Sequence, residues 1–154
     1  MHQTSAKHCD TGYNLAYDKT YEITLEVVSP MKDRNIECDF YGWNSDDFKK
    51  KEWLHNIYSR VSRFRGKRIF TLVGEIETYK IDIGFLWNAS NKGAFQLQIS
   101  SIFQTEKISG KLIVYKNDVH GFYRNNKGSY SLGVRSIDDQ RDNKPSKQDA
   151  QVSY

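Results

Sequence analysis

One short stretch of the chain carries the side chains best suited to binding an anion. Residues Ile57 to Phe70 read IYSRVSRFRGKRIF and include no acid. Five cations, which we call the basic run, fall within nine consecutive positions: Arg60, Arg63, Arg65, Lys67 and Arg68. Tyr58, Phe64 and Phe70 lie between or beside them. Because cations contact phosphates or carboxylates and rings stack on bases, this composition favours contact with nucleic acid or with an acidic protein.

The basic run also has a purely structural interpretation. Apolar residues from Trp53 to Phe64 recur at spacings of one, three and four, which predicts a helix that begins after Asn44 or Ser45 and ends at Gly66. Cations in the last turns of such a helix complement its exposed carbonyls by about 0.3–1 kcal/mol each. Capping does not require Lys67 and Arg68, which continue the run past Gly66. Against nucleic acid, the run would mostly contact phosphate and set affinity rather than base choice.

Rings on a solvated sheet face would supply stacking platforms for bases. Most of the 14% of residues that are aromatic must lie in the core of a domain this small. We expect Tyr41 and Tyr123 to be the exceptions, because alternation along their strands turns them away from the apolar face. The predicted binding site therefore comprises the basic run with these two tyrosines.

The sequence offers little for catalysis or metal binding. Asp118 and His120 fall on one side of an extended segment and could orient a general base, but no Ser or Cys motif accompanies them, and their surroundings are typical of a turn. His8, Cys9 and Asp10 are metal-competent side chains that lack the paired spacing of a zinc site. We therefore expect no enzymatic activity, no cofactor and no metal.

Length, net charge and cysteine content limit the class of protein to which the chain can belong. The 154 residues fit one domain, and the formal net charge of +4 favours an anionic partner only weakly. Cys9 and Cys38 are the two cysteines, and we interpret both as reduced thiols of a cytoplasmic protein, or of one in a virion or host-cell interior; a single disulfide is the alternative. We expect no secretory leader, and no window is apolar enough for a membrane span.

Predicted strands and one helix must position these residues. Alternating apolar residues predict strands over 21–27, 36–43, 70–76, 79–87, 95–99, 111–116, 119–123 and 129–134. Turn sequences such as residues 88–93 and 125–128 join them in sequential order. We therefore predict an α+β fold, mainly an antiparallel sheet or partly open β-barrel of about seven or eight strands, with one central amphipathic helix. Residues 1–19 would form a polar arm, 20–137 the domain and 138–154 a solvated tail.

Two functions follow as hypotheses. The first is a non-enzymatic domain that binds nucleic acid through the basic run. The alternative is a protein-binding inhibitor, immunity protein or accessory subunit, in which the run docks on an acidic protein and the chain belongs to a larger assembly. Under either hypothesis, Arg63→Glu combined with Arg65→Glu should abolish binding and leave folding intact.

Overall fold

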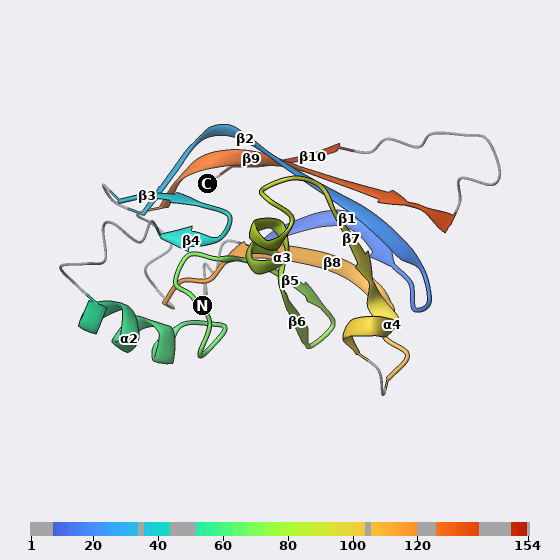
Figure 1. Cartoon of the computed structure of the whole chain (residues 1–154), viewed down its shortest axis with the longest axis horizontal. Coiled ribbons are helices and arrows are strands. Elements are labelled where there is room, and N and C mark those ends of the chain that lie inside the picture. Colours follow the sequence, from blue (N-terminus) through green and yellow to red (C-terminus); the bar gives the residue numbers. More distant parts are fainter. Residues whose placement is uncertain are drawn as a thin grey trace, which may run out of the picture.

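Two antiparallel sheets face each other, with a short helix between them (Figure 1). The computed structural model describes residues 8–33, 36–43, 52–103, 106–119, 126–138 and 149–153. One sheet has the order β1 (Cys9–Leu15), β8 (Gly110–Lys116), β5 (Leu72–Ile76) and β6 (Tyr79–Asp82). The other has the order β10 (Asp149–Ser153), β9 (Asn126–Ser136), β2 (Thr20–Asp33), β3 (Ile36–Asp39) and β4 (Gly42–Trp43), and β7 (Phe95–Gln98) also pairs with β2. The helices described are α2 (Glu52–Val61), α3 (Ile83–Ala89) and α4 (Ile99–Ile102).

The prediction of a mainly antiparallel, strand-rich domain is confirmed. The barrel and the single helix are not, because neither sheet closes and the described residues contain three helices. Strand order is also not sequential: β1 pairs with β8, and β2 with β9. Segments predicted as a polar arm and a solvated tail contribute the edge strands β1 and β10.

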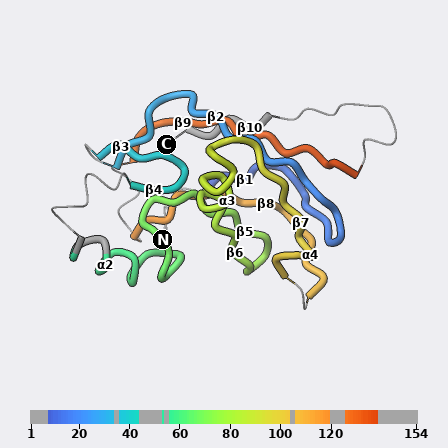
Figure 2. The backbone as a smooth tube through the Cα atoms, in the orientation of Figure 1, coloured from blue at the N-terminus to red at the C-terminus, as the bar shows by residue number. Residues whose placement is uncertain are grey.

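The long strands β2 and β9 run side by side along the long axis of the molecule (Figure 2). We expected β2 to end at Ser29 and Pro30, but it continues to Asp33. The register with β9 shifts on both sides of Ser29, which lets the strand pass a proline that cannot donate a ladder hydrogen bond. Opposite this point, a Cβ on Gly128 would lie 2.6 Å from the Pro30 carbonyl oxygen, so only glycine allows the close approach.

The strand predicted over 79–87 is wrong after Asp82, where α3 begins. The Asp82 carboxylate accepts a hydrogen bond from the Phe85 amide at 3.0 Å, as the N-cap of a helix does. It also accepts one from the Thr71 hydroxyl at 2.8 Å. Ile83 and Trp87 are buried in α3 at the i, i+4 spacing of a helix, so the same apolar residues fit both periodicities. The N-cap formed by Asp82 therefore selects the helix over the strand.

The core lies between the two sheets and is centred on aromatic residues. The Phe40 ring packs edge-on against Trp87 of α3, with centroids 4.9 Å apart, and against Tyr130 of β9, with centroids 5.4 Å apart. All three side chains are buried. Because Phe40 lies in the turn between β3 and β4, and Tyr130 in β9, this cluster packs α3 against the sheet that contains β2 and β9.

Lys116 is a charged residue inside this core, only 1% exposed. Its Nζ donates to the Asp39 carbonyl oxygen at 2.8 Å and lies 5.4 Å from the Phe40 ring centroid. Burial lowers the pKa of Lys116 to about 8, and burial raises the pKa of the nearby Cys38 thiol to about 12.

These two shifts predict opposite pH dependences of stability. Unfolded Lys116 holds its proton up to its usual pKa of 10.5, so the free energy of unfolding should rise by about 1 kcal/mol between pH 8 and 9. Above the usual thiol pKa of 9.0, folded Cys38 retains a proton that the unfolded chain loses, which offsets this rise. Urea denaturation from pH 7 to pH 10.5 measures both effects.

Two variants separate the contributions. Lys116→Met should lose the rise from pH 8 to 9, whereas Cys38→Ala should extend it toward pH 10.5. Each substitution places an apolar side chain that does not titrate at the buried position. Each variant is compared with wild type at every pH, so that the contributions of other titrating groups to the free energy of unfolding cancel. An unchanged pH profile in Lys116→Met would contradict this account.

Candidate functional site

The basic run lies on the last turn of α2 and on the loop that joins α2 to β5. Contrary to the sequence prediction, α2 ends at Val61, before Gly66. In a continuing helix, the amides of Arg63 and Phe64 would donate to carbonyls one turn earlier. Instead, the Arg63 amide donates to the Asp118 carbonyl oxygen at 3.1 Å, and the Phe64 amide to Asn117 Oδ1 at 2.7 Å. Tertiary hydrogen bonds therefore end the helix.

The fully buried Asn117 side chain holds the loop in place. Its Oδ1 accepts from the Phe64 amide, and its Nδ2 donates to the carbonyl oxygens of Phe64 at 3.1 Å and Arg68 at 3.0 Å. The Asn117 carbonyl oxygen also accepts from the Phe70 amide at 2.7 Å. One residue thus satisfies backbone groups at both ends of the loop. Asn117 precedes Asp118 in the predicted turn, and its local sequence gives no signal of this role.

Two arginines of the basic run have protein partners. Arg63 Nη2 lies 3.6 Å from Glu75 Oε2, and its guanidinium stacks 3.9 Å from the centroid of the Tyr115 ring. Glu75 of β5 therefore pairs with a member of the basic run. Only 19% of the Arg63 side chain is exposed, so Arg63→Glu would place two carboxylates together in a half-buried site. We therefore no longer expect the Arg63 and Arg65 double reversal to leave folding intact.

Arg68 is held in the same way. Its Nη2 lies 3.2 Å from Asp82 Oδ1, and its Nε donates to the Tyr41 carbonyl oxygen at 2.9 Å. The guanidinium lies 3.5 Å from the centroid of the Tyr41 ring and so covers one face of it. The structure thus brings Tyr41 and Arg68 together. Because Arg68 is also paired with Asp82, the N-cap residue of α3, its guanidinium is held against the protein.

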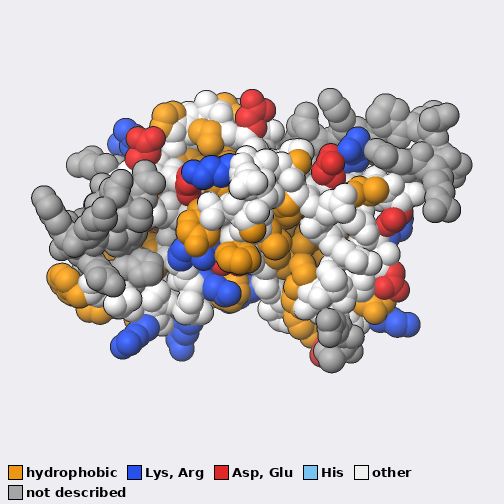
Figure 3. Space-filling view, in the orientation of Figure 1, with side chains coloured by type: hydrophobic (Ala, Val, Ile, Leu, Met, Phe, Trp, Pro, Cys, Tyr) orange, Lys and Arg blue, Asp and Glu red, His pale blue; other side chains and the backbone are white. Residues whose placement is uncertain are grey.

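The remaining cations of the run are exposed: Arg60, Arg65 and Lys67. Within the part of the chain that is described, none of them forms an ion pair. Lys and Arg side chains project below α2 along the lower border of the face seen in Figure 3. Arg60 lies in the last turn of α2, where it complements the helix dipole, as predicted for a structural role.

Lys80, on β6, joins this surface although the sequence analysis did not select it. Its Nζ donates to the Arg63 carbonyl oxygen at 2.9 Å and lies 5.7 Å from the centroid of the Phe64 ring. Lys67 Nζ lies 5.6 Å from the same centroid. The only sequence signal for Lys80 was alternation, which places it opposite Glu75 in the hairpin of β5 and β6.

A cleft of about 560 Å³ opens beside Phe64. Its lining residues come from the loop after α2, from the hairpin of β5 and β6, and from the end of α4: Arg63, Phe64, Arg65, Thr78, Tyr79, Lys80 and Phe103. The Tyr79 and Phe103 rings pack with centroids 5.0 Å apart and an interplanar angle of 59°. The cleft thus combines three rings with three cations, although Arg63 is already paired with Glu75.

The other predicted residues do not join the cleft. Tyr41 is absent from its lining, and Tyr123 and His120 lie outside the described residues. Asp118 is buried, which raises the pKa of its carboxyl group, and its Oδ1 and Oδ2 accept from the Val119 amide and from Asn126 Nδ2. These contacts give Asp118 a structural role beside the loop.

Cys9 and Cys38 are free thiols. Among the described residues, no group of three or more His, Cys, Asp or Glu side chains is arranged to hold a metal ion. Within the same residues, none of the helices combines the length and the apolar character that crossing a membrane requires.

Comparison of the chain with protein-family models, curated proteins and solved structures gives no match.

Proposed function

We propose that this protein is a non-enzymatic binding domain whose anionic partner is a nucleic acid. The observation that supports this most is the half-buried Phe64 ring, because the ammonium groups of Lys67 and Lys80 lie 5.6 and 5.7 Å from its centroid. Arg65 is exposed beside it. Cations near a ring can contact the phosphates that flank a stacked base, and this surface offers several of them.

The proposed contact surface differs from the set predicted from sequence. It comprises Arg65, Lys67 and Lys80 around Phe64, with Arg60 at its edge. Arg63 and Arg68 support it by fixing the two ends of the loop, since their charges are paired with Glu75 and Asp82. With so few exposed cations, affinity for a phosphate backbone should be moderate and strongly dependent on salt.

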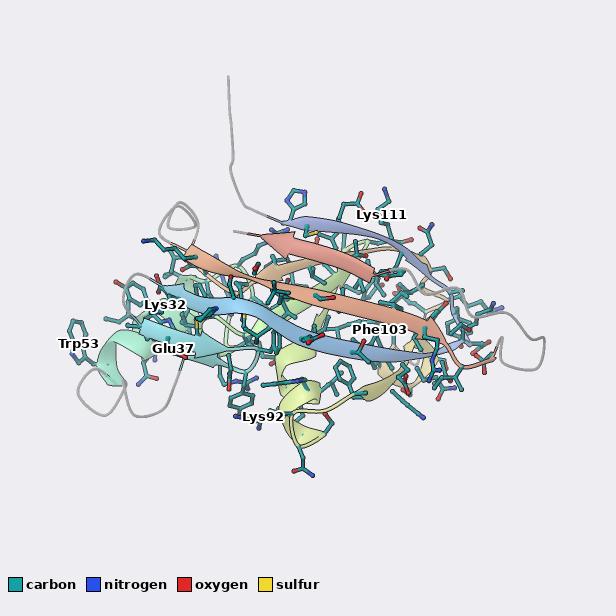
Figure 4. All side chains as sticks on the ribbon, turned by 90° about the horizontal axis from the view of Figure 1, so that it is seen from above. Lys32, Glu37, Trp53, Lys92, Phe103 and Lys111 are labelled. Atoms are coloured by element: carbon teal, nitrogen blue, oxygen red, sulfur yellow. The ribbon has the colours of Figure 1, made fainter. Side chains whose placement is uncertain are left out.

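An acidic protein is a second candidate, and one observation favours it. Trp53, Ile57 and Val61 lie on one face of α2 at the i, i+4, i+8 spacing, with 64%, 49% and 52% of their surfaces exposed. The Trp53 ring projects away from the sheets (Figure 4). Such an apolar stripe beside Arg60 suits a groove with an acidic rim, as an inhibitor, immunity protein or accessory subunit would use.

Titration of the purified chain into fluorescently labelled oligonucleotides tests the first proposal. Single and double strands of DNA and RNA, of about 6 and 24 nucleotides, are compared at low and at physiological salt. We expect a dissociation constant of about micromolar at low salt, which weakens with added salt and improves with oligonucleotide length. Absence of binding at low salt would overturn the nucleic-acid proposal.

The second candidate has a distinct readout. Trp53→Ala with Ile57→Ala should reduce capture of an acidic partner from cell extract and leave oligonucleotide binding unchanged, because neither residue lines the cleft. Equal capture by the variant and by wild type would count against a protein interface on α2.

A further inference from the structure

The cleft beside Phe64 differs from a flat basic surface because three rings lie in its wall. Phe64, Tyr79 and Phe103 come from three separate segments and are all half-buried. The packed pair of Tyr79 and Phe103 fixes the orientation of both rings. Rings held in this way lose little conformational entropy when a flat ligand stacks on them.

The shape of the surface suits an unpaired nucleic-acid strand better than a duplex. Proteins that read duplexes insert a protruding helix or ribbon into a groove about 12 Å wide. Here the rings line a hollow, and the protruding helix α2 carries the apolar residues Trp53, Ile57 and Val61 on its exposed face. A base in a duplex presents only its edges, whereas an unpaired base presents the face that stacking requires.

The charges around the cleft suit the backbone of such a strand. Arg65 and Lys80 line the cleft, and Lys67 Nζ lies 5.6 Å from the centroid of the Phe64 ring. The volume of about 560 Å³ is in the range of pockets for small ligands, which typically run from about 300 to 1,000 Å³. The cleft is shallow and open to solvent, so a base could enter it from the surface.

We propose that this cleft seats an unpaired base of a single-stranded nucleic acid against its rings, while the adjoining phosphates contact Arg65, Lys67 and Lys80. This inference rests on the proposed function and adds strand selectivity to it. Because DNA and RNA share the phosphate and the base face, both satisfy the proposal, and the experiment compares them.

The experiment uses three forms of one 12-nucleotide sequence: the single strand, its duplex, and a single strand with abasic residues at alternate positions. All carry a fluorescent label and are titrated with wild-type protein at equal salt, as DNA and as RNA. We expect the single strand to bind about tenfold tighter than the other two forms, since stacking is lost in both. Equal or tighter binding of the duplex or of the abasic strand would overturn the inference.

Removing one aromatic ring of the cleft tests whether the preference for the intact single strand arises there. Phe103→Ala should weaken binding of the intact single strand about tenfold and abolish its advantage over the abasic strand. Phe85→Ala is the matched control, because Phe85 is 51% exposed and lies outside the cleft lining. The comparison of DNA forms on wild-type protein decides the question even if Phe103→Ala does not fold. If no form binds, the proposed function fails with the inference; if all forms bind equally, only the inference fails.

Discussion

Reversing two exposed charges should weaken nucleic-acid binding by about a hundredfold or more at low salt. Arg65→Glu with Lys67→Glu replaces two proposed phosphate contacts by two repulsive carboxylates beside Phe64. Within the described ranges neither side chain has an ion-pair partner, so the free energy of unfolding should change by no more than about 0.5 kcal/mol. Fluorescence anisotropy measures binding, and urea denaturation measures stability.

The matched control makes the same change of charge on the other sheet. Lys32 and Lys127 are exposed, face each other across β2 and β9, and do not line the cleft. Lys32→Glu with Lys127→Glu should retain most of the affinity, because long-range repulsion is screened beyond about 10 Å at 0.1 M salt. Equal losses in both double variants would mean that net charge, rather than this surface, governs binding.

Replacing Asn117 by alanine should cost about 2–4 kcal/mol of the free energy of unfolding and weaken binding as well. The change removes the acceptor of the Phe64 amide, and it removes one of the donors to the Phe64 and Arg68 carbonyl oxygens, beside the fully buried position of Asn117. Since these groups fix the loop that carries Arg65 and Lys67, the cations would lose their positions. Urea denaturation and oligonucleotide titration measure the two effects.

The control for this variant is Asn56→Ala, which removes the same amide from an exposed position on α2. It should change the free energy of unfolding by no more than about 0.5 kcal/mol. Asn117→Asp adds a sharper test: it retains an acceptor for the Phe64 amide but directs a carboxylate at two carbonyl oxygens, so it should also destabilise the fold. A fully stable Asn117→Ala variant would contradict the anchoring role.

Local pattern predicted much of the strand content. Alternation located the buried part of β2, and it located β5, β7, β8 and β9, because every second residue points toward the core, although β5 and the end of β8 are buried on both faces. It failed where a single side chain changed the structure. Asp82 caps α3 within a segment that alternates like a strand, and the bulge around Ser29 carries β2 past Pro30.

The site was predictable only in part. The cluster of cations is visible in the sequence, but the acids that pair with Arg63 and Arg68 are distant along the chain, at Glu75 and Asp82. In the folded chain, Arg63 and Arg68 of the basic run are therefore paired with acids, whereas its other cations are exposed. Lys80 and the rings of the cleft come from other segments, and no local pattern joins them to Phe64.

The most direct test of the central claim is to map where an oligonucleotide contacts the protein. Amide chemical shifts of isotopically labelled protein are followed by NMR during titration with a single-stranded 12-mer at low salt. We predict shifts concentrated at residues 63–67 and 78–80 and at Phe103, with β9 and β10 unaffected. Shifts confined to another face, or no shifts at millimolar oligonucleotide, would contradict the account.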